Sequence, residues 1–397
     1  MKKTLLAAAL LTGFAGVASA QSSVTLYGVV DVAVRYQNWN LSKGPGSAVD
    51  VSTSSIALAS GTYNTSRFGI KGVEDLGSGN QAVFVYEANL NAQNGTMSAS
   101  GAPTDTLFGR QSTVGLRNDA WGQFDMGRQL GLSYKFLAPV DNAFLINTGI
   151  VNLSAVMGVT GVRYSNMLMY QSPSLSGFKV GGSYSFNTGL ATLSQKSSGL
   201  AATDTATGSA FDTGNNQRAI TGAVSYTNGP IYVTATYDKI TPASNTIAGA
   251  NGGGVSSWIV GGAYDAKVVK IGVAYSQVRG GIINGGTNSS VSGDIINPYA
   301  AGGVVFADGA GHNSYNINAV VPVGADGQVM ATYQGQAAVG YLADSGFAAT
   351  MSAFGLGYVH NFTKRTAIYG IYSYTNNYQN IAGLSGNTLA VGVRHAF

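Results

Sequence analysis

The sequence predicts an all-β fold, a transmembrane antiparallel β-barrel of sixteen strands. Three observations lead to this prediction. Charged residues make up only 10% of the 397 residues, against about 25% in typical soluble domains. Gly occurs 56 times and Tyr 22 times. Apolar and polar residues alternate with period two over many segments, and no run of about eighteen apolar residues follows the first twenty residues, so helical membrane spans are not expected.

The first twenty residues have the form of a secretory signal peptide. Lys2 and Lys3 give a positive start, residues 5–17 are an apolar run, and Ala18-Ser19-Ala20 is a small-x-small cleavage site. The alternative is a single membrane anchor, but nothing like a stop-transfer segment follows. We therefore expect residues 1–20 to be cleaved and residues 21–397 to form one barrel domain.

Charge and cysteine content exclude several classes of function. Without Lys2 and Lys3 the formal charge falls from +4 to +2, and the remaining positive residues are scattered, so no nucleic-acid partner is expected. The chain has no Cys, which excludes metal sites built on thiolates, and no pair of His residues has the spacing of a metal site. We therefore expect no metal and no cofactor.

Alternation identifies the strands but does not by itself distinguish a barrel from a soluble β-sandwich. In 231–237 and in 269–275 the odd positions are apolar, and Lys270 points to the opposite face. The connections between strands favour the barrel, because short turns alternate with long loops along the chain. Strands of about ten residues with short turns at one end and long loops at the other are typical of bacterial outer-membrane barrels.

The connections also give the number of strands. Seven short turns are predicted at 76–79, 118–122, 173–177, 228–229, near Ala266, at 324–327 and at 363–365. Eight long loops are predicted at 37–64, 92–106, 130–160, 187–216, 241–255, 281–312, 336–349 and 376–387. Fifteen connections separate sixteen strands, and a barrel of this size is wide enough for an aqueous channel.

The sheet must close on itself. A long antiparallel sheet with bare edges would leave backbone groups unpaired in lipid or would aggregate. We therefore predict that the first strand, 24–36, pairs with the last strand, 388–397.

Aromatic residues cluster near the predicted strand ends. Amphipathic rings favour the headgroup level of a membrane, so we expect two aromatic girdles, while ordinary sheet packing is the alternative. The residues are Tyr27, Tyr36, Tyr170, Tyr184, Tyr226, Tyr237, Trp258, Tyr264, Tyr275, Tyr333, Tyr358 and Phe362.

One long stretch has no clean period. Between Gly127-Arg128-Gln129 and Gly161-Val162-Arg163 lie about thirty residues that match neither strand nor helix. A structureless segment of this length is uncommon in a compact fold and is usually functional. We predict that the third long loop, about 130–160, folds into the lumen of the barrel and narrows a pore.

The chain resembles the general, trimeric porins of Gram-negative bacteria, and is most similar to those of β-proteobacteria. The resemblance covers essentially the whole mature chain, and the order and spacing of its motifs make it specific. These motifs are Ser-Val-Thr-Leu-Tyr-Gly-Val-Val-Asp at 23–31, Ser-Arg-Phe-Gly-Ile-Lys-Gly-Val-Glu-Asp-Leu-Gly at 66–77, Val114-Gly115-Leu116, Trp121-Gly122-Gln123-Phe124, Gly127-Arg128-Gln129 and Val-Gly-Val-Arg-His-Ala-Phe at 391–397.

The resemblance implies a function and partners. It implies an outer-membrane general diffusion porin, a passive water-filled channel for ions and small hydrophilic solutes. It implies a homotrimer surrounded by outer-membrane lipids. The terminal Phe397 resembles the family's assembly signal, which implies recognition of the last strand by the outer-membrane barrel assembly machinery.

The resemblance also implies a charged constriction. Acid residues on the inward loop face arginines on the opposite wall, and the matching positions here are Arg67, Arg110 and Arg163. Asp141 is the only carboxylate in 130–160 and is the candidate loop acid, while Lys135 in the same loop adds a positive charge. The family often has more than one acid there, so this chain is expected to show weak charge selectivity, with a modest preference for anions.

Strand phase supports part of this assignment. Charge on the lipid face costs about 2–4 kcal/mol at the bilayer midplane, so charged residues should point inward. By this rule Asp31 and Arg35 face the lumen in the first strand, and Arg67 and Lys71 do so in the second. Arg110 shares its phase with the apolar Val114 and Leu116, so its direction rests on the resemblance. Glu87 is either a constriction residue or a solvated residue of the lumen or rim.

Two other functions remain as alternatives. A substrate-selective channel would need an aromatic track or a denser basic lining, which the sequence does not show. A barrel enzyme would need a nucleophile, a base and an orienting group at the rim. The chain has only three His residues: His360 and His395 share the phase of apolar strand faces, and His312 is placed at a loop edge. The sequence therefore favours a channel over an enzyme.

Overall fold

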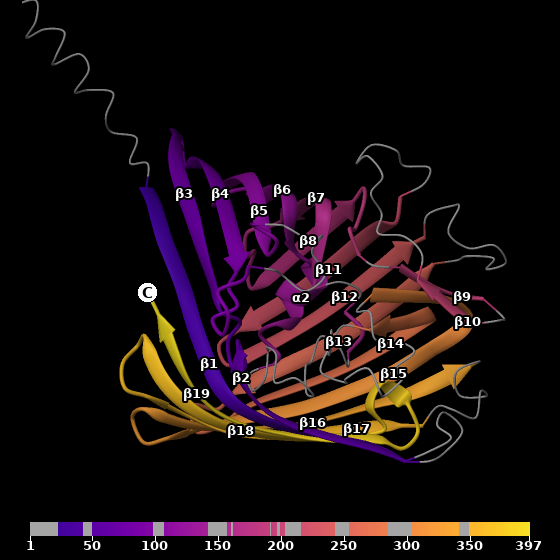
Figure 1. Cartoon of the computed structure of the whole chain (residues 1–397). Coiled ribbons are helices and arrows are strands. Elements are labelled where there is room, and N and C mark those ends of the chain that lie inside the picture. The colour runs from indigo at the N-terminus through magenta and orange to yellow at the C-terminus, as the bar shows by residue number, and fades with distance from the viewer. Residues whose placement is uncertain are drawn as a thin grey trace, which may run out of the picture.

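The computed structural model is a closed antiparallel β-barrel (Figure 1). It describes residues 23–42, 50–97, 107–141, 157–159, 162–190, 192–196, 199–202, 216–242, 254–284, 303–340 and 349–397. The strands are β1 (Ser23–Leu41), β2 (Val51–Ser60), β3 (Arg67–Gly77), β4 (Asn80–Asn89), β5 (Gln111–Asn118), β6 (Gly122–Leu130), β7 (Arg163–Gln171), β8 (Phe178–Ser185), β9 (Thr192–Lys196), β10 (Gly199–Ala202), β11 (Arg218–Asn228), β12 (Ile231–Thr241), β13 (Val255–Asp265), β14 (Lys270–Asn284), β15 (Gly303–Val323), β16 (Gly327–Gly340), β17 (Met351–Asn361), β18 (Thr366–Asn376) and β19 (Leu384–Ala396).

These segments form the predicted sixteen barrel strands. The sheet contains nineteen segments in hydrogen-bonded order. β2 and β3 both pair with β1 and together make one barrel strand, and β9 and β10 form an additional hairpin between β8 and β11. Nineteen minus one for the split strand and minus two for the hairpin gives sixteen.

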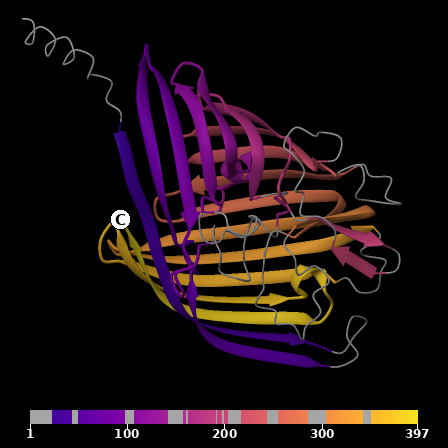
Figure 2. The same cartoon turned by 45° about the horizontal axis from the view of Figure 1, so that its top comes forward.

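The predicted closure is confirmed. β1 pairs antiparallel with β19, from Val29 opposite Ala396 to Leu41 opposite Leu384. The two strands, at opposite ends of the colour bar, lie side by side in both views (Figures 1 and 2). At the turn end of this seam, Phe397 and Gly28 exchange two backbone hydrogen bonds of 3.1 and 3.2 Å. Every backbone edge along the seam is thereby paired, as a lipid environment requires.

The two faces of the wall differ as the alternation predicts. On β1, Val24, Leu26 and Val34 are exposed, while Asp31 and Ala33 are buried. Many of the predicted girdle aromatics are also exposed: Tyr36, Tyr170, Tyr237, Trp258, Tyr264, Tyr275, Tyr333, Tyr358 and Phe362. Tyr27 was placed wrongly among them, because its hydroxyl donates to Glu87 on the inward face. Among the described residues, no helix is long and apolar enough to cross a membrane.

The seven predicted short turns all fall between paired strands, but several long loops are shorter than predicted. β1 continues to Leu41 and β2 occupies 51–60, so 37–64 is mostly strand. In the same way, β14 runs to Asn284 and β15 begins at Gly303, so the expected loop at 281–312 is wrong at both ends and His312 lies within a strand. Polar residues such as Asn38, Asn40, Ser52 and Ser54 make the first of these segments resemble a loop, although β2 also carries exposed apolar side chains at Ile56 and Leu58.

Candidate functional site

The described part of the segment after β6 lies inside the ring of strands (Figure 1). It contains the short helix α2 (Leu132–Leu137), and its described part, 131–141 and 157–159, is largely buried. The remaining residues of the predicted constriction loop, 142–156 and 160, lie outside the described residues.

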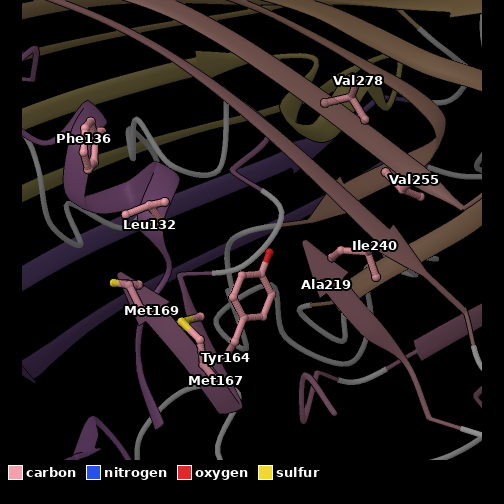
Figure 3. Close-up of a cluster of buried hydrophobic side chains, with 9 residues drawn as sticks. All are labelled: Leu132, Phe136, Tyr164, Met167, Met169, Ala219, Ile240, Val255 and Val278. Atoms are coloured by element: carbon pink, nitrogen blue, oxygen red, sulfur yellow. The ribbon is translucent and has the colours of Figure 1, made fainter. Parts of the chain in front are cut away.

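An apolar cluster holds α2 against the inner wall. Figure 3 shows Leu132 and Phe136 of α2 together with buried side chains of β7 and β11–β14. The other members are Tyr164, Met167, Met169, Ala219, Ile240, Val255 and Val278. Burial of apolar side chains stabilises such contacts by about 25 cal/mol per Å² removed from water. α2 is therefore packed on one side of the barrel.

Polar contacts carry the segment across to the wall formed by β12–β15. Ser133 donates to Asp238 at 2.8 Å, and Tyr232 donates to the Phe136 carbonyl at 2.6 Å. Further along, Asn318 donates to the Val140 carbonyl at 3.1 Å. Gly272 lies beneath this carbonyl, since a Cβ built there would lie 1.8 Å from the oxygen. Only glycine permits this approach of the segment to β14.

Three of the predicted arginines meet at the loop end of β3–β7. Arg110 Nε contacts Glu87 Oε1 at 2.6 Å, and Arg67 Nε lies 3.6 Å from Glu87 Oε2. Arg163 Nε donates to the Arg110 carbonyl at 2.9 Å. Glu87 therefore bridges Arg67 and Arg110, and the backbone of Arg110 holds the guanidinium of Arg163.

Arg128 and two tyrosines complete this site and were missed from the sequence. Arg128 donates to the Gly109 carbonyl at 2.7 Å and to Ser165 at 2.8 Å, and it is close enough to Arg163 to interact electrostatically. We call Arg67, Arg110, Arg128 and Arg163 the arginine cluster. Tyr27 donates to Glu87 at 3.0 Å, and Tyr134 of α2 interacts electrostatically with the cluster. The sequence signal for Arg128 is its place in the motif Gly127-Arg128-Gln129, one of the motifs that carry the resemblance.

The unclear phase of Arg110 has a structural cause. β5 begins at Gln111, which lies opposite Glu87, so Arg110 precedes the strand and does not follow its alternation. Its backbone N–H donates to the Glu87 carbonyl at 3.1 Å. The phase shared with Val114 and Leu116 therefore carries no information about the direction of this side chain.

The other candidate residues lie apart from the cluster. Lys71 Nζ lies 5.4 Å from the centre of the Tyr27 ring, one layer nearer the short turns. Arg35 is half-buried on β1 opposite Ala390 of β19. Asp31 is fully buried and accepts four hydrogen bonds, so its carboxylate is satisfied by protein donors. Arg394 lies directly opposite Asp31; the phase of Val391 and Val393 would have indicated its inward direction.

The two charged residues of the segment itself point to different places. Lys135 Nζ donates to Gln129 at 3.1 Å and lies near Asp125 and Lys179. Burial lowers the pKa of Lys135 below its ordinary value, because the charged form loses hydration. Asp141 is buried next to Val140 at the far wall and interacts electrostatically with Tyr134. Within the described residues, no group of three or more His, Asp or Glu side chains could hold a metal ion.

Comparisons with known proteins cover almost the whole chain. A family model described as Gram-negative porin matches residues 7–380. The chain is 37% identical over 410 residues to an outer membrane porin protein of Bordetella pertussis, and the match covers all of both chains. An anion-selective porin from Comamonas acidovorans has a similar structure, with a TM-score of 0.66 and 25% identity over 95% of this chain and 100% of that one.

A more distant structure shares the fold alone. The trimer form of OmpT, an outer membrane protein of Vibrio cholerae, has a TM-score of 0.56 and 15% identity, and the match covers 95% of this chain and 99% of that chain.

Proposed function

The chain belongs to the Gram-negative porin family, and we propose that the arginine cluster and the inward segment at 130–160 form the constriction of its channel. It is an outer-membrane β-barrel and a passive diffusion channel. Members of its family are channels and not enzymes. Solutes move down their own gradients through the lumen, so no cofactor or energy source is required.

The observation that carries the proposal is the unequal charge at Glu87. Arg67 and Arg110 contact Glu87, and Arg163 interacts with it electrostatically. Arg128 adjoins Arg163, so the cluster holds four guanidinium groups and one carboxylate, a surplus of three positive charges within this group of residues. A surface of one sign with low-dielectric walls raises the local concentration of the opposite ion. We therefore propose a modest preference for anions; the related structure from Comamonas acidovorans is described as anion-selective.

The mechanism follows from the position of α2. The segment takes up space between the arginine cluster and β12–β15, so a passing solute comes close to the guanidinium groups. Anions and polar solutes exchange water for these donors, whereas apolar solutes must displace ordered water without compensation. Small hydrophilic molecules would therefore pass faster than apolar molecules of equal size.

We also propose that the protein is a homotrimer and that its last strand is recognised by the barrel assembly machinery. The trimer form described for OmpT supports the first proposal. For the second, Phe397 pairs with Gly28 at the end of the seam and keeps 47% of its surface exposed. Deletion of Phe397 should lower the amount of folded protein in the outer membrane. The predicted signal peptide, 1–20, lies outside the described residues, and N-terminal sequencing of the exported protein should begin at Gln21.

The central test is reconstitution of the refolded protein into a planar bilayer under a salt gradient. We expect stepwise ohmic conductance, with steps in groups of three and a reversal potential on the anion side. A cation-side reversal potential would contradict the proposed role of the arginine cluster. A folded barrel that leaves the membrane silent would contradict an open channel.

A further inference from the structure

A second inward element interrupts the second barrel strand. Ser60 of β2 lies opposite Val32 of β1, and Arg67 of β3 lies opposite Val29. Six residues, 61–66, therefore stand opposite only two, Val30 and Asp31, which leaves four extra residues on this strand. Strand pairing cannot accommodate an excess of four, so the extra chain must leave the plane of the wall. We call residues 61–66 the inner turn.

Asp31 anchors this inner turn. Its carboxylate accepts hydrogen bonds from the backbone N–H groups of Thr62 at 3.0 Å and Asn64 at 2.8 Å, with a longer contact of 3.4 Å from Tyr63. The backbone of Asp31 holds both ends of the turn, through Gly61 at 2.9 Å and the hydroxyl of Ser66 at 2.9 Å. Successive N–H groups converging on one buried carboxylate fix a loop strongly.

The inner turn points into the lumen. The ring of Tyr63 lies 5.3 Å from the ring of Tyr369, whose hydroxyl also donates to Asp31 at 2.7 Å. Tyr63 packs on the inward-facing cluster of β16–β19, while Ile368 and Tyr372, which have the opposite phase to Tyr369 on β18, are exposed on the outer face. The turn therefore covers inward residues on the side of the barrel where β1 meets β16–β19, away from α2.

The inner turn also holds the first member of the arginine cluster. Arg67 follows it directly, and Arg67 Nη1 donates to the Thr65 carbonyl at 3.1 Å. The same guanidinium approaches Glu87 at 3.6 Å. The direction of Arg67 thus depends on two partners, one of which is placed by Asp31 through the backbone of the turn.

We propose that residues 61–66 are a second constricting element of the pore, with Asn64 lining the passage and Asp31 acting as the positioning residue for Arg67. The proposal rests on the channel function given above but does not depend on the role of 130–160. It assigns to Asp31 an indirect effect on anion selectivity, although its own carboxylate is buried.

The first experiment uses the absence of cysteine from the chain. The single variant Asn64→Cys is reconstituted in a planar bilayer and treated with a water-soluble, negatively charged methanethiosulfonate reagent. If the turn lines the pore, the attached sulfonate should narrow the passage and lower the single-channel conductance by at least one third, with a shift of the reversal potential toward cations. Mass spectrometry establishes that the thiol was modified.

Leu58→Cys is the matched control, because Leu58 lies on the adjoining strand β2 and is exposed on the outer face. Its treatment should leave the conductance unchanged. A conducting Asn64→Cys channel that is not modified, or that is modified without a change in current, would overturn the proposal. If the unsubstituted protein itself does not conduct, the porin function is contradicted instead.

The second experiment tests the positioning role of Asp31. Asp31→Asn and the milder Ser66→Ala are each measured with Arg67 present and with Arg67→Gln. If Asp31 acts through Arg67, both variants should shift the reversal potential when Arg67 is present and should lose most of that shift in the Arg67→Gln background. Equal shifts of the reversal potential in both backgrounds, or no shift in either, would overturn the positioning role. If Asp31→Asn does not fold, the Ser66→Ala measurements alone decide the test.

Discussion

The two sides of the lumen differ in chemistry. The side formed by β3–β7 carries the arginine cluster and Glu87. On β12–β16, the buried polar side chains among the described residues are hydroxyls and amides, apart from Asp238 and His312. The charged side can act on ions, while the neutral side holds the inward segment through Tyr232, Asn318 and the bare backbone of Gly272. Selectivity and support of the constriction are thus divided between opposite walls.

The largest effect should follow from removing charge on the first wall. Arg67→Gln with Arg110→Gln leaves Glu87 facing fewer positive groups, and we expect the anion-to-cation permeability ratio to fall about tenfold, the equivalent of ~1.4 kcal/mol. Reversal potentials under a salt gradient measure this ratio. The matched pair Thr234→Val and Thr332→Val on the neutral wall should leave it unchanged. The division between the walls would be wrong if both pairs had the same effect.

Gly272→Ala should break the contact on the neutral wall. The new methyl group would overlap the Val140 carbonyl, and overpacking of this kind costs about 1–3 kcal/mol. We expect the segment to leave the wall, which should raise single-channel conductance and open-channel noise with little change in the permeability ratio. Gly222→Ala on β11 is the control, since a Cβ there meets nothing within 4 Å. Equal conductance in the two variants would show that Gly272 does not hold the segment.

Glu87→Gln should change the anion-to-cation permeability ratio in the opposite direction to the loss of Arg67 and Arg110. It removes the bridging carboxylate from Arg67 and Arg110, so the anion-to-cation permeability ratio should rise severalfold. Tyr27→Phe keeps the charge and removes one hydrogen bond to Glu87, which is worth about 1 kcal/mol. That variant should change thermal stability slightly and selectivity hardly at all. A fall in anion preference for Glu87→Gln would contradict the model of the site.

Asp141→Asn should shift selectivity toward anions by a smaller factor. The carboxylate is buried at the far wall, so its field reaches the arginine side over a longer distance. The reversal potential measures the shift, and Asn318→Ala serves as a control for displacement of the neighbouring Val140. An unchanged reversal potential would remove Asp141 from the constriction.

The smallest effect should be a dependence on alkaline pH. Because burial lowers the pKa of Lys135, this residue should lose its charge as pH rises before an exposed lysine does. Anion preference should therefore fall slightly over that range of pH. Lys135→Met should have the lower preference at neutral pH and should lack this step in the titration. An identical titration in both proteins would exclude Lys135 from the charge balance of the pore.

The alternation of apolar and polar residues is sufficient to predict the strands of the barrel wall but not the elements that lie inside the lumen. Period two places Arg67 and Lys71 on the inward face of β3, and the same rule would have found Arg394. It fails at Arg110, which precedes its strand, and at 37–41 and 51–60, where the sheet continues through polar residues such as Asn38, Asn40 and Ser54 as well as through the exposed Ile56 and Leu58. The alternation of apolar and polar residues predicts the direction of a side chain only where the residue lies in a regularly hydrogen-bonded strand.

The partners of inward residues depended on contacts distant in sequence. The sequence leaves two roles open for Glu87, because no local pattern shows that Arg110, 23 residues later, contacts its side chain. Strand phase places Asp31 on the inward face. It does not show that residues 61–66 cover this side chain or that Tyr369, 338 residues away, donates a hydrogen bond to it. Such contacts are set by the register of the closed barrel, which the alternation of single strands does not determine.

The seam between β1 and β19 has a kinetic consequence. Gln37 and Thr388, separated by 351 positions, share a hydrogen bond there, so the ring cannot be completed until the last residues have been synthesised. Pairing between such remote segments forms slowly, because the intervening chain loses conformational entropy before the new contacts contribute favourable free energy. The strands therefore remain an open sheet until the C-terminal strand is available to pair with β1. Once closed, the ring has no free end at which unravelling could begin, and its lifetime depends on the barrier to reopening this one junction.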